Sequence, residues 1–227
     1  MCTVTYTPKK DGFILTSSRD ENIYRPTSDL EIHYLNQQNI LFPQDLESKG
    51  TWVASSKNRV LCLLNGAIEF NHQIDDKLSR GKVLLENFKY LNSNDFIQNI
   101  PFERVSPFCL IQIDHNEKTT LEVIKWNGRQ VKQHSLIKDK QYIWTSSSLY
   151  DSTIENNRKV SFDRWMKKKG VKPIQFHLDL IPINKKELKK KNDKLKTVSI
   201  TNIERTRDGL TFDYFDLINN KKSILRL

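Results

Sequence analysis

MCTVTYTPKKDGFILTSSRDE, residues 1–21, contains two strand-like segments on either side of a turn. Cys2–Tyr6 and Phe13–Ser18 are rich in the β-branched and aromatic residues that favour strands. Between them, Pro8–Gly12 (PKKDG) has the composition of a turn. We therefore expect the chain to open with a β-hairpin.

The rest of the chain predicts more strands, with a few helices among them. Strands are predicted at Thr51–Ala54, Arg59–Asn65, Phe108–Asp114, Thr120–Trp126, Gln130–Leu136, Tyr142–Ser146, Thr197–Glu204, Leu210–Leu217 and Ser223–Leu227. Helices are predicted at Ser79–Leu91, Asn94–Ile100, Asp151–Lys169 and Ile174–Leu180. Arg19–Gly50 is polar, is interrupted by Pro26 and Pro43, and predicts irregular structure. Because strands come in antiparallel runs and not in strict βαβ alternation, the pattern favours an α+β fold.

Length and composition limit the class of protein. A chain of 227 residues fits one domain, residues 1–227, or at most two small ones, and can bury a core without disulfides or metals. Its three cysteines include no close pair and predict no disulfide framework. The first residues do not resemble a secretory leader, and apolar runs such as Val60–Leu64 are too short to span a membrane. We therefore expect a cytoplasmic protein.

The excess positive charge lies in the last third of the chain. Residues 158–227 hold 19 Lys and Arg against 8 Asp and Glu, within a chain whose net charge is +10. Asn184–Lys196 contains seven of these lysines but no arginine and no aromatic residue, the residues that make nucleic-acid recognition specific. We expect an exposed, solvated segment and no specific nucleic-acid site. Salt-sensitive binding of an anionic polymer is the alternative.

Several kinds of chemistry leave no trace in the sequence. It has neither the glycine-rich motif of dinucleotide-binding proteins nor that of P-loop proteins, and it lacks the G-x-S-x-G nucleophile elbow. Its five histidines stand singly, without the spacing of metal ligands. We therefore expect no metal site and no cofactor.

Cys2 is a candidate catalytic residue because of its own functional groups. Methionine aminopeptidase removes Met1 efficiently when the second residue is small, which would leave a thiol and a free α-amine on one residue. An α-amine has a pKa of about 7.7–8.0 and a thiol about 8.5, so the amine can take the thiol proton near neutral pH. One residue would then be both nucleophile and base. Cys62 and Cys109 lie inside apolar strands and are expected to be structural.

A series of short motifs runs through most of the chain. They are MCTVTY (Met1–Tyr6), SRDE (Ser18–Glu21), RP (Arg25–Pro26), GTWV (Gly50–Val53), VLCLLNG (Val60–Gly66), SRG (Ser79–Gly81), WTSSSLYD (Trp144–Asp151) and TVSIT (Thr197–Thr201). In this order they resemble the transport and Golgi organisation protein 2 family, also called the NRDE family, and most closely its short bacterial members. Ser18 stands where the family motif has Asn, and Ser147 stands near a second Asn of related hydrolases.

The resemblance implies a four-layer αββα sandwich of the N-terminal-nucleophile (Ntn) hydrolase type, with mainly antiparallel sheets. It implies that Cys2 is the nucleophile and that Arg19 lies near its thiol, where a cation favours the thiolate. By the same resemblance, Asp20 orients the α-amine and Asn65 donates to an oxyanion hole. Ser147 and Glu21 are further candidates for contacts with substrate or oxyanion.

Arg19 and Asp20 are adjacent in the sequence, which limits how both can approach Cys2. Side chains of adjacent residues in a regular strand point to opposite faces. Arg19 and Asp20 can therefore both reach Cys2 only where the strand ends or bulges.

Two functions follow from this interpretation. The first is an amidohydrolase that acts on a small-molecule amide, a non-peptide linear amide, or on an acyl substrate such as a thioester. The alternative is a non-catalytic carrier of haem or another hydrophobic ligand on the same fold, because eukaryotic relatives have been linked to haem mobilisation. The sequence does not determine the oligomeric state.

Overall fold

A computed structural model describes residues 3–66, 78–168, 172–181 and 194–227. Cys2 and most of the predicted lysine-rich segment, residues 184–196, lie outside the described residues. The chain divides into two compact units. The terminal unit comprises Met1–Tyr24 and Asp139–Leu227, and the central unit is Arg25–Lys138.

The terminal unit is built on a six-stranded sheet in the order β10-β1-β2-β11-β12-β13, with every pairing antiparallel. Its strands are β1 (Thr3–Lys9), β2 (Gly12–Asn22), β10 (Tyr142–Thr145), β11 (Leu195–Thr206), β12 (Gly209–Asp216) and β13 (Lys221–Arg226). The predicted opening hairpin is confirmed, with its register running from Thr3 opposite Ser18 to Lys9 opposite Gly12. Gly12 has a positive φ, and a Cβ there would collide with the carbonyl oxygen of Arg205, so the turn requires glycine.

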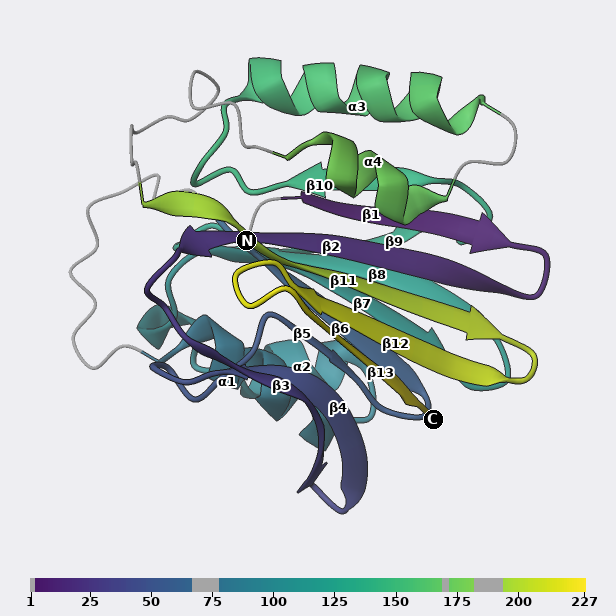
Figure 1. Cartoon of the computed structure of the whole chain (residues 1–227). Helices are drawn as coiled ribbons and strands as arrows, with labels where there is room; N and C mark the ends of the chain where they lie inside the picture. The colour runs from purple at the N-terminus through teal and green to yellow at the C-terminus, as the bar shows by residue number, and fades with distance from the viewer. Residues whose placement is uncertain (1–2, 67–77, 169–171, 182–193) are drawn as a thin grey trace. The chain divides into compact units, whose positions relative to one another are not determined.

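Two helices lie on one face of this sheet. They are α3 (Ser152–Met166) and α4 (Pro173–Asp179), and Figure 1 shows them beside β10 and β1. The Asp151 side chain begins α3 by accepting a hydrogen bond from the backbone N–H of Ile154 at 2.9 Å. Phe162 and Phe176 join the two helices, with ring centroids 5.1 Å apart. The helix face of the sheet therefore has its own small core.

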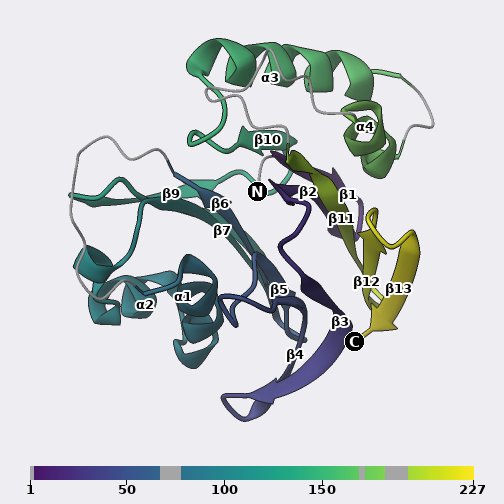
Figure 2. The same ribbon diagram turned by 60° about the vertical axis from the view of Figure 1, so that its left-hand side comes forward.

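The central unit contains a seven-stranded antiparallel sheet whose strands follow the chain order, β3 to β9. These strands are β3 (Thr27–Leu35), β4 (Gln38–Asp45), β5 (Val53–Ser55), β6 (Arg59–Asn65), β7 (Phe108–His115), β8 (Thr119–Trp126) and β9 (Val131–Leu136). Helices α1 (Arg80–Glu86) and α2 (Ser93–Asn99) lie over one face of it (Figure 2). Two single turns of 3₁₀-helix accompany them, η1 (Asn87–Lys89) and η2 (Phe102–Arg104).

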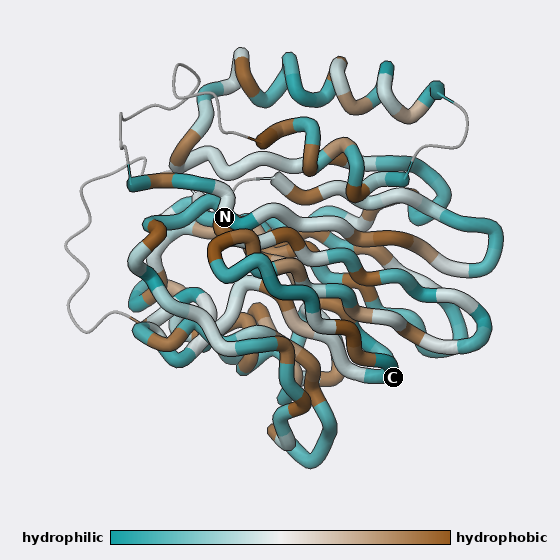
Figure 3. Tube along the Cα trace, viewed as in Figure 1, coloured by the Kyte–Doolittle hydropathy of each residue, from teal (hydrophilic) through white to brown (hydrophobic). Residues whose placement is uncertain are grey.

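Hydropathy follows the strands in both units. Figure 3 shows hydrophobic and hydrophilic positions alternating along many strands, as expected where the two faces of a sheet differ. Strand β6 differs from this pattern, because Val60–Leu64 is apolar and buried throughout. A continuous apolar run is typical of a strand covered on both faces.

The prediction of irregular structure over Arg19–Gly50 is wrong. The strand β2 continues to Asn22, and β3 and β4 form a hairpin across Asn36 and Gln37, both of which have positive φ. The polar composition of β3 has a physical cause, since β3 is the edge strand of its sheet and its side chains are mostly exposed or half-buried. Pro43 does not interrupt the strand, because it lies within β4.

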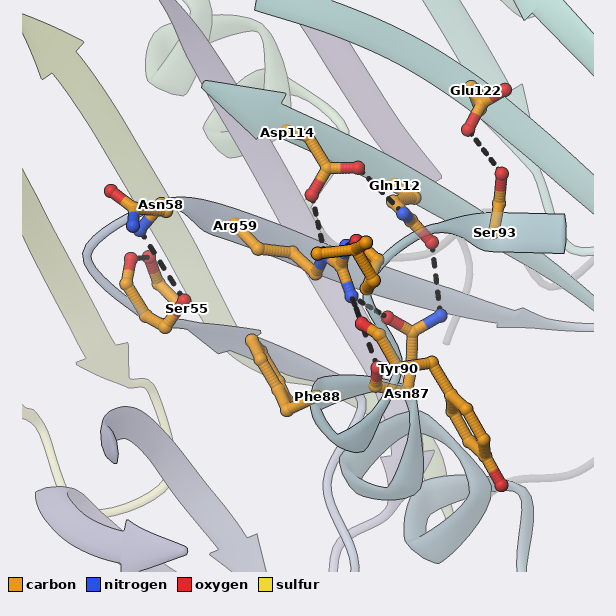
Figure 4. A network of polar contacts seen from close by, with 12 residues as sticks. Ser55, Asn58, Arg59, Asn87, Phe88, Tyr90, Ser93, Gln112, Asp114 and Glu122 are labelled. Carbon is orange, nitrogen blue, oxygen red and sulfur yellow. Dashed lines mark hydrogen bonds and ion pairs between the residues drawn. The ribbon is translucent and has the colours of Figure 1, made fainter. Parts of the chain in front are cut away.

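The predicted helix Ser79–Leu91 also ends early, and Arg59 explains where. Its guanidinium, buried under the end of the helix, donates to the backbone carbonyl oxygens of Asn87 (3.1 Å), Tyr90 (2.9 Å) and Leu91 (2.7 Å) and pairs with Asp114 (Figure 4). Carbonyl oxygens at the end of a helix have no hydrogen-bond donor within the helix and need one from elsewhere. The helix α1 ends at Glu86, and carbonyl oxygens beyond its end accept hydrogen bonds from Arg59.

Candidate functional site

The candidate site begins with two charged residues buried on β2. Arg19 is 3% exposed and Asp20 is 4% exposed. Glu21 follows them and is only half-buried, with a carboxylate oxygen 4.0 Å from the Arg19 guanidinium. Charged side chains are rarely buried unless they have an ion-pair or hydrogen-bond partner or a role in binding or catalysis.

The sheet is irregular at this point. Arg19 lies opposite Ser199, whereas Asp20 lies opposite Thr197, so Val198 is an extra residue on β11. This is a β-bulge, which often marks a place where a side chain is re-aimed. The sequence predicts that Arg19 and Asp20 can both reach Cys2 only where their own strand ends or bulges, whereas the extra residue lies on the partner strand and β2 itself continues to Asn22.

Both oxygens of the Asp20 carboxylate are held by hydroxyl groups. Thr197 Oγ1 donates to Oδ1 at 2.6 Å, and Tyr150 Oη donates to Oδ2 at 3.3 Å. Three of the motifs quoted from the sequence, SRDE, WTSSSLYD and TVSIT, therefore converge on one carboxylate. Sequence reasoning missed Tyr150 and Thr197 as site residues, although their place in those motifs was the signal that could have found them.

Two further polar residues, Arg158 and His177, are buried on the helix face of the sheet. Arg158 of α3, 7% exposed, donates from Nη1 to Thr3 Oγ1 at 2.7 Å, and its guanidinium lies 3.9 Å from the centre of the Tyr150 ring. His177 of α4 is fully buried, with Nε2 and Thr5 Oγ1 2.9 Å apart. Burial, together with the positive charge of Arg158, lowers the pKa of His177 to about 3, so its imidazole is neutral at physiological pH.

The remaining predicted residues lie at several places. Thr3, whose partner on β2 is Ser18, is the first described residue, and Cys2 lies outside the described part of the chain. Ser147 is exposed in the segment between β10 and α3 and precedes Tyr150 by three residues. Asn65 is the last residue of β6 in the central unit, opposite Phe108.

The other two cysteines lie in the interior of the central sheet. Cys62 is fully buried on β6, and Cys109 is partly buried on β7. Such positions suit a small hydrophobic side chain. Among the described residues, no cluster of three His, Cys, Asp or Glu side chains could hold a metal ion. Over the same residues, we find no helix with the length and apolar character needed to cross a membrane.

The chain matches a known protein family in sequence and is similar to solved proteins in structure. The profile of the family described as Transport and Golgi organisation 2 matches residues 1–220. In structure, the chain is similar to the conjugated bile acid hydrolase from Clostridium perfringens, solved as a mutant, with a TM-score of 0.60, 9% identity, and coverage of 100% of this chain and 92% of that chain. It is also similar to penicillin V acylase from Agrobacterium tumefaciens, with a TM-score of 0.49, 8% identity, and coverage of 100% and 86%. No curated protein matches the chain in sequence.

The likeness to the bile acid hydrolase establishes the fold. Both sheets of the present chain are antiparallel, and its helices cover sheet faces. The predicted α+β fold of the Ntn-hydrolase type, with mainly antiparallel sheets, is therefore confirmed. At 9% identity the likeness concerns the fold alone.

Proposed function

Because the chain belongs to the Transport and Golgi organisation 2 family, we propose that it is an amidohydrolase with Cys2 as an N-terminal nucleophile. Its substrate in this proposal is a small molecule with a non-peptide linear amide or a thioester. The observation that carries the proposal is the buried Asp20 carboxylate, held by two hydroxyls beside the first residues of β1.

The energetic cost of this arrangement supports a functional role. Burying Arg19 and Asp20 removes two charges from water, which costs several kcal/mol per ion in a protein interior. The sheet needs no charge at the position of Arg19, since Leu15 and Phe13, at even spacing before it on β2, are apolar and buried. Charged side chains buried in this way are often found at functional sites.

The position of the pair fits a nucleophile at the start of β1. Thr3 pairs with Ser18, and Cys2 and Arg19 are the residues that come next along the two antiparallel strands. In the proposal, the Asp20 carboxylate accepts a hydrogen bond from the Cys2 α-amine and orients it. The Arg19 guanidinium favours the thiolate and can bind a substrate carboxylate.

The proposed reaction has two steps. In the first, the α-amine takes the thiol proton, the Cys2 sulfur bonds to the acyl carbon, and the C–N bond breaks as the α-ammonium returns the proton to the leaving amine. In the second, water attacks the thioester with the amine as base, which releases the carboxylic acid and restores the thiol. Asn65 is the proposed side-chain donor to the oxyanion of both tetrahedral intermediates.

The first test is the state of the N-terminus. Intact mass of the purified protein should show loss of one methionine, because the mechanism requires a free Cys2 amine. A panel of N-acyl amides and acyl thioesters is then screened for turnover, with the Cys2 acyl-enzyme detected by mass. Cys2→Ala should abolish turnover, whereas Cys109→Ala, on a partly buried strand position, should retain it.

Two results would contradict the proposal. One is complete retention of Met1 in the native protein, and the other is unchanged turnover in Cys2→Ala. If Met1 is retained and titration with haem shifts the haem absorbance, the carrier function replaces the hydrolase.

A further inference from the structure

We propose that Arg158 and Tyr150 are positioning residues, which together hold the nucleophile end of β1 and the Asp20 carboxylate in one fixed geometry. The inference rests on the proposed function. Neither residue is needed to touch substrate, and both come from the segment that begins α3. Two lines of contact, one to β1 and one to β2, start from the Arg158 guanidinium.

The first line of contact runs to β1. Arg158 Nη1 donates to Thr3 Oγ1 at 2.7 Å, and Thr3 directly follows Cys2 in the sequence. Arg158 and Thr3 are both buried, so water does not compete for this hydrogen bond. A charge-assisted bond of this length restricts the rotation and position of Thr3.

The second line of contact runs to β2. The Arg158 guanidinium lies 3.9 Å from the centre of the Tyr150 ring, and Tyr150 Oη donates to Asp20 Oδ2 at 3.3 Å. A cation over the face of a phenol ring withdraws electron density from it, which makes the hydroxyl a better hydrogen-bond donor. Tyr150 and Leu195 also form one cluster of buried residues, so apolar packing adds to the contacts that hold the Tyr150 side chain.

Both sets of contacts depend on helix α3, which carries Arg158 and begins just after Tyr150. Asp151, between Tyr150 and the first turn of α3, caps that turn through the backbone N–H of Ile154. Arg158 lies within the 15-residue helix, so regular helical geometry sets its position relative to the capped first turn, which directly follows Tyr150 in the chain. A displacement of α3 would therefore move Thr3 and Asp20 together, on two different strands.

A purely structural role for the same contacts is the competing explanation, and the reactivity of Cys2 distinguishes the two. The probe is iodoacetamide, and the measurement is the alkylation rate of the N-terminal peptide by mass spectrometry between about pH 6 and pH 10, where thiol and amine titrate. His177 does not contribute to this profile, because burial and the charge of Arg158 lower its pKa to about 3. Among the residues that the structure describes, the charged groups of the proposed site are Arg19, Asp20 and Glu21 on β2 and Arg158 on α3.

Tyr150→Phe removes one hydroxyl and leaves the ring. The expected result is a Cys2 alkylation rate at pH 7 lower by roughly fivefold, the loss of about one hydrogen bond, with the midpoint moved toward that of an ordinary thiol. Tyr142→Phe, a phenol deletion on β10 in the same unit, should leave the profile unchanged. Thermal melting of each variant checks that the fold is intact.

The line to Thr3 is tested with a matched pair of variants. Thr3→Val keeps the shape of the side chain but cannot accept the hydrogen bond from Arg158, whereas Thr3→Ser keeps the hydroxyl. Thr3→Val should slow Cys2 alkylation, and Thr3→Ser should restore it to near the original rate. Arg164→Ala, an exposed position on α3, is the control for a change of charge on the helix.

The outcomes separate this inference from the proposed function. If Cys2 in the unaltered protein shows the profile of an ordinary thiol, both fail. If Cys2 is activated in the unaltered protein but Tyr150→Phe and Thr3→Val, both folded, keep its rate and midpoint, the positioning role alone is overturned.

Discussion

His177 shows how much a single side chain can depend on its surroundings. It is fully buried between α4 and the sheet, contacts the Thr5 hydroxyl through Nε2, and lies in the field of the buried Arg158. A second positive charge there would be desolvated and repelled. The imidazole is therefore held neutral, which suits a residue that organises packing and leaves the candidate base to the Cys2 amine.

The stability of the protein should fall in mild acid because of His177. Its pKa is about 6.5 when unfolded and about 3 when folded, so between these values the unfolded state binds one more proton. This contribution to stability is complete above pH 6.5 and is lost as the pH falls toward 3, by up to about 1.4 kcal/mol per pH unit.

Urea unfolding at about one-unit steps between pH 7 and pH 4 measures this dependence. His177→Gln keeps an amide near Thr5 but does not titrate, so its unfolding free energy should depend less steeply on pH. An equal slope in the two proteins would mean that other groups cause the acid sensitivity.

At the scale of the element, η1 and the end of α1 depend on one side chain from the sheet. Arg59 of β6 satisfies three backbone carbonyl oxygens and Asp114 at once (Figure 4). Asn87 extends the network by donating to Gln112, which in turn donates to Asp114. The helix layer of the central unit is therefore attached to its sheet through a closed set of polar contacts.

Replacing Arg59 with Met should lower the free energy of unfolding by about 3 kcal/mol or more, because carbonyls and a carboxylate are left without their cation. Lys89→Ala is the control, since it breaks an exposed pair with Glu86 in the same segment and should cost less than about 1 kcal/mol. Urea unfolding measures both changes. Equal, small effects would show that water replaces Arg59 without cost.

Much of this was open to prediction from the sequence at the level of elements. The predicted strands Thr120–Trp126 and Gln130–Leu136 correspond to the paired strands β8 and β9, and the predicted strand Arg59–Asn65 is β6. The hairpin of β3 and β4 was missed because an edge strand is polar on its exposed side. The partners of Asp20 were missed because Tyr150 and Thr197 are distant in sequence, and only the sheet order brings them to β2.

At the scale of the whole molecule, charge is distributed unequally along the chain. Residues 158–227 carry the entire excess of positive charge, with lysines gathered in Asn184–Lys196. Such a segment can attract phosphates, but it lacks the arginine and aromatic residues that usually make nucleic-acid recognition specific. We expect its binding to nucleic acid to be weak and non-specific.

Two duplex DNAs of unrelated sequence should therefore bind with equal affinity, and the affinity should fall steeply with salt. Replacing five of the lysines with Gln should reduce the salt slope by up to about 0.9 per lysine in contact with phosphate; the five are Lys185, Lys186, Lys189, Lys190 and Lys191. The control replaces exposed lysines of the central unit, namely Lys57, Lys118 and Lys132. A sequence preference that survives high salt would contradict the expectation.

The strand order of the terminal unit also determines when, during synthesis, the surroundings of Asp20 can form. The strand β2 lies between β1 and β11, and Asp20 bonds to a threonine 177 positions later in the chain. During synthesis, the ribosome must therefore release nearly the whole chain before the surroundings of Asp20 can assemble. An enzyme that trims the first methionine would meet a nascent chain whose sheet is still incomplete. Maturation of the N-terminus and folding of the site are thus expected to occur in that order, as two separate events.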